Sequence, residues 1–84
     1  DIKVELDIEK VVGNLCNIKV IVKDSELRSL KDKLRAELIS KGRELASEMI
    51  KNGEVLMEDI RPGRYVIKIR KDKRIYGELA LKVE

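Results

Sequence analysis

Apolar and charged residues alternate one for one at the start of this 84-residue chain, and the same period returns along much of its length. Within residues 2–8, one side of the pattern carries Ile2, Val4, Leu6 and Ile8. Side chains two positions apart share a face of a β-strand, so this pattern predicts a half-buried strand. After a turn at Gly13-Asn14, alternation over residues 17–23 predicts a second strand.

Residues 25–51 are compatible with two different structures. Several leucines and Met49 fall near helical spacing, Ser25 could cap a helix and Asn52-Gly53 could end it, which favours a long amphipathic helix. The same stretch also divides into two alternating segments, 34–39 and 44–50, joined by a glycine turn. Gly42 discriminates only weakly between the helix and the two strands, because a glycine inside a helix costs only about 1 kcal/mol.

The segment KNGEVLMEDIRPGRYVIKI, residues 51–69, contains two turn signals. Asn52-Gly53 favours a tight hairpin, and Pro62-Gly63 has the composition of a type II turn, with glycine at the position of positive φ. Tyr65 begins the next strand and is expected to anchor a corner of the core with its hydroxyl near the surface. In that strand the pattern turns Tyr65, Ile67 and Ile69 inward and Val66, Lys68 and Arg70 outward.

This segment resembles the signature of prealbumin-like β-sandwich modules, of the collagen-adhesin B-type and carboxypeptidase-regulatory-like families. Their signature is an Asn-Gly turn, a strand that ends in an acidic residue and leucine, and then Pro-Gly-x-Tyr before the last core strand. The matching positions are Asn52, Gly53, Val55, Met57, Asp59, Ile60, Pro62, Gly63 and Tyr65. The resemblance covers about residues 30–70, and it departs from the family at Met57, where an aromatic residue is usual.

The resemblance implies an all-β fold, a seven-stranded immunoglobulin-like (prealbumin-like) sandwich that forms a single domain over residues 1–84. The expected strands are 2–8, 17–23, 34–39, 44–50, 54–58, 64–70 and 75–83. The alternative is an α+β domain with a central helix near 25–51, whose leucine face would pair with a partner helix. The family resemblance also implies a cell-surface or extracellular location, although the chain itself leaves the compartment undetermined.

The composition indicates a charged surface around a core without large aromatic residues. Charged residues are 42% of the chain, but 19 basic and 16 acidic side chains leave a net charge of only +3. Abundant Lys and Glu, with no Gln and no His, are typical of proteins from thermophiles. No apolar run approaches the ~20 residues that cross a bilayer, so we expect no membrane span in this chain. Its first residue, Asp1, fits a fragment of a larger protein.

The sequence offers few groups for catalysis. Without histidine there is no Ser-His or Cys-His nucleophile, and the five isolated glycines form no phosphate-binding loop. The one cysteine, Cys16, cannot form an internal disulfide or a cysteine zinc cluster, and we expect it to be buried. Glu58 and Asp59 are neighbours, but adjacent strand residues should point to opposite faces and could not flank one bond. We therefore expect no enzyme activity, no metal ion and no cofactor.

Basic residues near the last two strands form the candidate interaction surface. Two clusters should lie at opposite ends of the strand over 64–70, about 20 Å apart at 3.3 Å per residue. The residues are Arg61, Arg64, Lys68, Arg70, Lys71, Lys73 and Arg74.

The leading hypothesis is a non-catalytic accessory module of a larger protein. It would act as a spacer, or it would bind other domains of the parent chain or a protein partner through the two clusters. The alternative is a weak nucleic-acid or polyanion binder that uses Lys68, Arg70 and the flanking arginines. Nucleic acid is the less favoured partner, because acids are interspersed among these bases and stacking aromatics are nearly absent.

Overall fold

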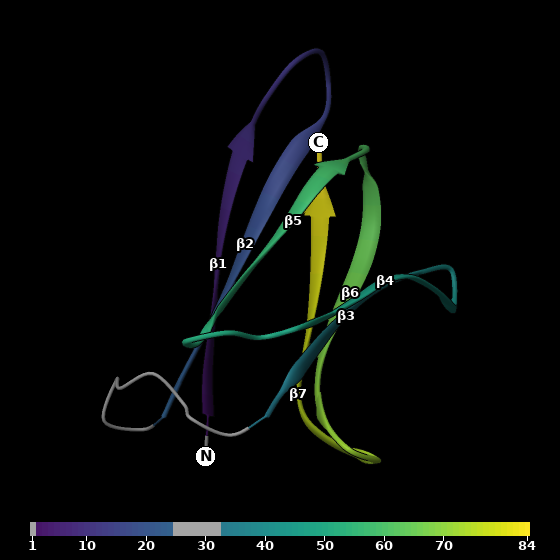
Figure 1. The fold of residues 1–84 in the computed structure, drawn as a ribbon. Helices are drawn as coiled ribbons and strands as arrows, with labels where there is room; N and C mark the ends of the chain where they lie inside the picture. Colours follow the sequence, from purple (N-terminus) through teal and green to yellow (C-terminus); the bar gives the residue numbers. More distant parts are fainter. Residues whose placement is uncertain (1, 25–32) are drawn as a thin grey trace.

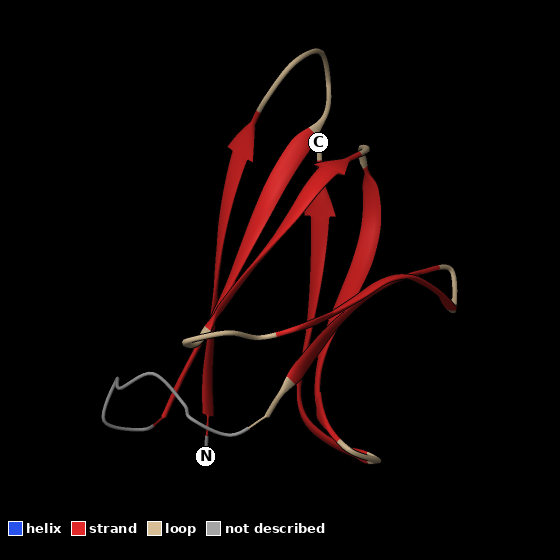
Figure 2. Cartoon of the chain, in the orientation of Figure 1, coloured by secondary structure: helices blue, strands red, loops and turns tan. Residues whose placement is uncertain are grey.

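The structure, a computed structural model, describes residues 2–24 and 33–84 and contains seven β-strands within them, with no helix in these two ranges (Figure 2). Each strand end lies within two residues of the end expected from the sequence. The strands are β1 (Ile2–Lys10), β2 (Cys16–Asp24), β3 (Arg35–Ser40), β4 (Arg43–Met49), β5 (Glu54–Ile60), β6 (Gly63–Lys71) and β7 (Arg74–Val83).

The strands form two antiparallel sheets that pack together as a β-sandwich (Figure 1). One sheet has the order β1-β2-β5 and the other has the order β4-β3-β6-β7. The all-β prediction is thereby confirmed. The alternative prediction, a central helix near 25–51, is wrong for residues 33–51, because this segment contains the strands β3 and β4. The rest of that segment, 25–32, lies outside the described residues.

Small aliphatic side chains fill the space between the sheets. Strand β2 turns Ile18, Val20 and Val22 inward, and all three have no exposed surface. Ile67 and Ile69 of β6 face them from the other sheet and are 0% and 1% exposed. Each such side chain contributes about 1.5–3 kcal/mol on burial, so the core obtains its stability from many similar residues. The outward residues of the same strands carry the charges, as the alternation predicts.

Single-residue bulges interrupt three of the strand pairings. They lie in β2–β5 near Cys16, in β3–β4 after Leu38, and in β6–β7 at Ile69. A bulge inserts one extra residue on one strand, which changes the face to which the following side chains point. In β4 this leaves Leu45 58% exposed, while the next residue, Ala46, packs against the core.

The Asn52-Gly53 turn is tight, but it does not join neighbouring strands of one sheet. Asn52 and Gly53 have φ values of 54° and 78°, and Lys51 and Glu54 exchange two backbone hydrogen bonds of 3.0 and 3.1 Å. Beyond this single bridge the chain separates, because β4 belongs to the four-stranded sheet and β5 to the three-stranded sheet. The turn therefore carries the chain from one sheet to the other.

Candidate interaction site

The turn that contains Pro62 and Gly63 closes one end of the sandwich. The Tyr65 ring is 8% exposed, and its hydroxyl donates a 2.7 Å hydrogen bond to the backbone carbonyl of Arg61. This bond spans four residues and holds the turn against the ring. Gly63 has a φ of 156° and starts β6 in an extended conformation, whereas a type II turn would need about +80°. The turn is thus not of the type that the sequence predicts.

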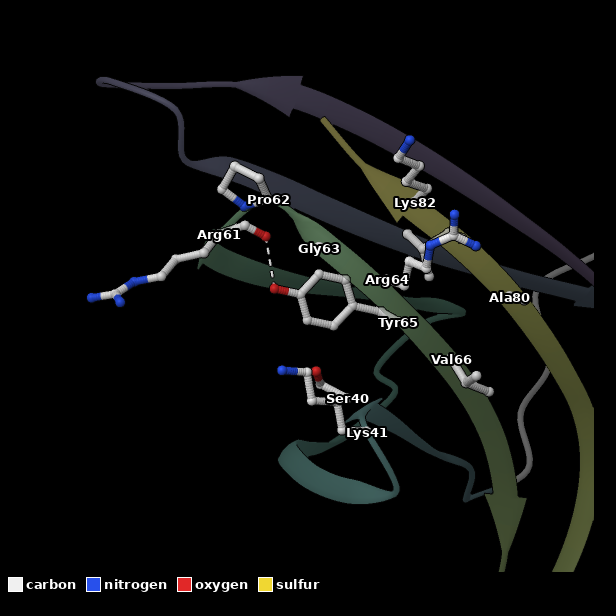
Figure 3. A pocket seen from close by; sticks show the side chains of 11 residues that line it. Ser40, Lys41, Arg61, Pro62, Gly63, Arg64, Tyr65, Val66, Ala80 and Lys82 are labelled. Carbon is white, nitrogen blue, oxygen red and sulfur yellow. Dashed lines mark hydrogen bonds between the residues drawn. The ribbon is translucent and has the colours of Figure 1, made fainter.

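A solvent-open hollow of about 870 Å³ lies beside this turn (Figure 3). We call it the Pro62 hollow. It is lined by Ser40 and Lys41 of the β3–β4 hairpin, by residues 61–66, and by residues 80–82 of β7. These segments meet because β6 lies between β3 and β7 in the four-stranded sheet. The hollow is larger than two others, of about 540 and 310 Å³, which lie along β4 and β5.

The lining of the Pro62 hollow contains four basic residues, Lys41, Arg61, Arg64 and Lys82, and no acidic residue. Arg64 and Lys82 are direct cross-strand partners, and their side chains extend side by side in Figure 3. Like charges placed opposite each other destabilise a sheet. Lys82 lies 3.5 Å from a carboxylate oxygen of Glu84, and the two side chains are 60% and 79% exposed. In the described ranges no acid forms an ion pair with the other three cations.

The middle of β6 has a different electrostatic environment. Lys68 lies 3.8 Å from Glu78 of β7, and Arg70 donates a 3.1 Å hydrogen bond to Glu37 of β3. The Arg70 and Glu37 side chains are 29% and 13% exposed, so their pair is screened less than the other surface pairs. Lys68 and Arg70 therefore face carboxylates of neighbouring strands, and they do not extend the basic lining of the hollow along β6.

The remaining predicted surface residues lie at the other end of β6. Lys71 and Arg74 pair across the hairpin that joins β6 to β7, and Lys73 is exposed at its tip. The Arg74 guanidinium stacks over the Tyr76 ring, 5.2 Å from its centroid. The sequence thus places two basic clusters at opposite ends of β6, and the structure has them there. Arg61 and Arg64 line the same hollow, although their side chains extend to opposite sides in Figure 3, and β6 separates both from Lys71, Lys73 and Arg74.

Two residues of the hollow, Lys41 and Lys82, were not among the candidate residues from the sequence. Lys41 sits in the β3–β4 turn with a φ of 51°, where the two-strand prediction places a glycine turn, but only the pairing of β3 with β6 brings this turn to the hollow. Lys82 is an outward residue of β7 in the alternation pattern. Only the pairing of β7 with β6 reveals that it faces Arg64.

Glu58 and Asp59 do not follow the strict alternation on which their separation was predicted. Asp59 has a φ of 58°, and its backbone N–H donates a 3.1 Å hydrogen bond to Oδ1 of Asn17 at the β2–β5 bulge. Both acids border the hollow of about 310 Å³ beside β4. Both side chains are exposed.

The Cys16 side chain is buried, at 1% exposure. The residues that the structure describes contain no group of three or more potential metal ligands.

Comparisons with known proteins give no relative for this chain. A scan against protein-family models, a search of curated proteins and a search of solved structures each found no match. Within the ranges that the structure describes, no helix has the length and hydrophobicity needed to cross a bilayer.

Proposed function

We propose that this chain is a non-catalytic, prealbumin-like β-sandwich module of a larger protein, and that it binds a partner through the Pro62 hollow. The observation that carries the proposal is the set of four cations around one hollow whose lining has no acid. Lys68 and Arg70, in contrast, face carboxylates of neighbouring strands. A cluster of bases held near one another costs stability through repulsion, and an anionic partner surface would offset that cost.

The absence of histidine and the burial of Cys16 favour a binding role over a catalytic one. The rigid sandwich would keep the hollow in a fixed shape while the turn residues make the contacts. Lys73 and Arg74, at the far hairpin, are not part of this proposed surface.

The test compares two variants that change the net charge equally. The hollow variant, Arg64→Glu/Lys82→Glu, reverses two charges in the Pro62 hollow. The far-end variant, Lys73→Glu/Arg74→Glu, reverses two charges at the opposite end of β6. Each protein, immobilised after its fold is verified by a thermal melt, is used for affinity capture with quantitative mass spectrometry. We expect the same proteins on the wild type and the far-end variant, and their loss from the hollow variant. Retention by the hollow variant, or equal loss from both, would show that this surface does not make the contacts.

A further inference from the structure

The pair Arg64 and Lys82 forms an anion-binding arrangement in the Pro62 hollow. Directly opposed residues of neighbouring strands have their Cβ atoms about 4.5–5.5 Å apart, so one carboxylate can contact both of their charged groups. An arginine guanidinium also offers two parallel N–H donors to a carboxylate. A carboxylate between the two side chains would replace their repulsion by two attractions.

An apolar pair lies beside this basic pair on the same face of the sheet. Val66 of β6 faces Ala80 of β7, two positions along from Arg64 and Lys82. Two positions along a strand span about 6.6 Å, and side chains two apart in an extended peptide have the same spacing. An extended segment with a carboxylate at one position and an aliphatic residue two positions away therefore matches both pairs.

Lys41 adds a third cation, across the Tyr65 ring from this pair in Figure 3. The ring is 8% exposed and offers no open face on which a nucleic-acid base could stack. Glu84 already places a carboxylate 3.5 Å from Lys82 Nζ. These features favour a peptide carboxylate over a nucleotide phosphate.

From these observations we propose that the Pro62 hollow binds an acidic peptide segment in which acidic and aliphatic residues are two positions apart. Arg64 and Lys82 hold one carboxylate, Val66 and Ala80 contact the aliphatic side chain, and Lys41 attracts a second acid. This assignment rests on the proposed function, because it names the ligand of the same site.

The experiment measures the fluorescence anisotropy of a short labelled peptide. Glutamate and valine alternate along this peptide, and a single serine lies between each of them and the next. One control peptide has glutamine for glutamate, and another has the same composition with glutamate and valine adjacent. The protein is used as the wild type, as the Arg64→Glu/Lys82→Glu variant and as the Lys73→Glu/Arg74→Glu variant. An exposed ion pair contributes up to about fivefold in affinity, so loss of the two pairs should weaken binding by up to about 25-fold.

The proposal expects saturable binding at low salt, weaker binding of both control peptides, and loss only in the hollow variant. Glu84→Gln should strengthen binding a few-fold, because the Glu84 carboxylate no longer competes for Lys82. Absence of binding, or equal weakening in both double variants, would overturn the proposal. So would tighter binding of an oligothymidylate that is lost in the same hollow variant, because the ligand would then be a nucleic acid. If affinity capture still loses its partners in the hollow variant, the binding function stands and only the ligand class is wrong.

Discussion

Replacing Arg64 by glutamate should make the protein more stable, although it removes a residue proposed to bind the ligand. Arg64 faces Lys82 directly, so Arg64→Glu converts a repulsive cross-strand pair into an attractive one. Such pairs differ from neutral ones by about 0.2–1 kcal/mol in either direction. The Lys82 side chain is 60% exposed, and Glu84 competes for it, which puts the expected gain near the lower end, at about 0.5 kcal/mol. For a domain of this size that is a rise of about 2–4 °C in Tm.

The assay is urea unfolding of five proteins: the wild type, Arg64→Glu, Arg64→Gln, Lys82→Gln and the double variant Arg64→Glu/Lys82→Gln. The neutral variant Arg64→Gln serves as the control for loss of the arginine alone and should show part of the gain. The gain in the free energy of unfolding from Arg64→Glu should disappear when Lys82 is already glutamine. It should also disappear in molar salt, where the screening length is about 3 Å. If Arg64→Glu is no more stable than Arg64→Gln, or if Lys82→Gln does not change its effect, the two side chains do not repel each other as the register implies.

Three further predictions concern the turn, the core and the thiol. Gly63→Ala should cost up to about 3 kcal/mol, because its φ of 156° belongs to a region that residues with a side chain rarely adopt. The control Gly42→Ala, at a φ of 77° with no atom within 4 Å, should cost only about 1 kcal/mol in the same urea titration. Ile67→Ala should cost about 2–5 kcal/mol, because Ile67 is completely buried, whereas Ile75→Ala, at a residue 44% exposed, should cost less than about 0.5 kcal/mol. The Cys16 thiol should react with a disulfide reagent only as fast as the protein opens, and rapid labelling in native buffer would contradict the burial of Cys16 at 1% exposure.

Strand positions were predictable because they depend on local alternation, whereas turn geometry depended on contacts across the fold. The sequence identifies Gly63 as a residue that needs unusual backbone freedom, but not that the Tyr65 hydroxyl would bond to the Arg61 carbonyl. It likewise identifies Asn52-Gly53 as a tight turn, but not that the strands beyond it enter different sheets. In both cases the local conformational preference is correct, and the long-range packing determines where the chain goes next.

The candidate site depended on register, which alternation alone does not determine. In the β6–β7 hairpin, Lys71 faces Arg74 and Arg70 faces Ile75. If that register continued along the strands, Tyr65 would face Ala80, and an inward side chain would be paired with an outward one. Cross-strand partners in an antiparallel pair point to the same face, so this arrangement cannot bury both apolar patterns.

One extra residue on β7 resolves the conflict. The register shifts between Ile69 and Arg70, where Tyr76 has no partner of its own, and from there Tyr65 faces Leu81 and Arg64 faces Lys82. The need to bury the aliphatic residues of both strands thus requires a bulge, and the bulge places two cations opposite each other at the far end of the hairpin. The requirement was present in the sequence, as a mismatch between the turn and the two alternation patterns. The bulge also determines the partners of the charged residues, because every residue beyond it shares the register that buries the core residues of its strand.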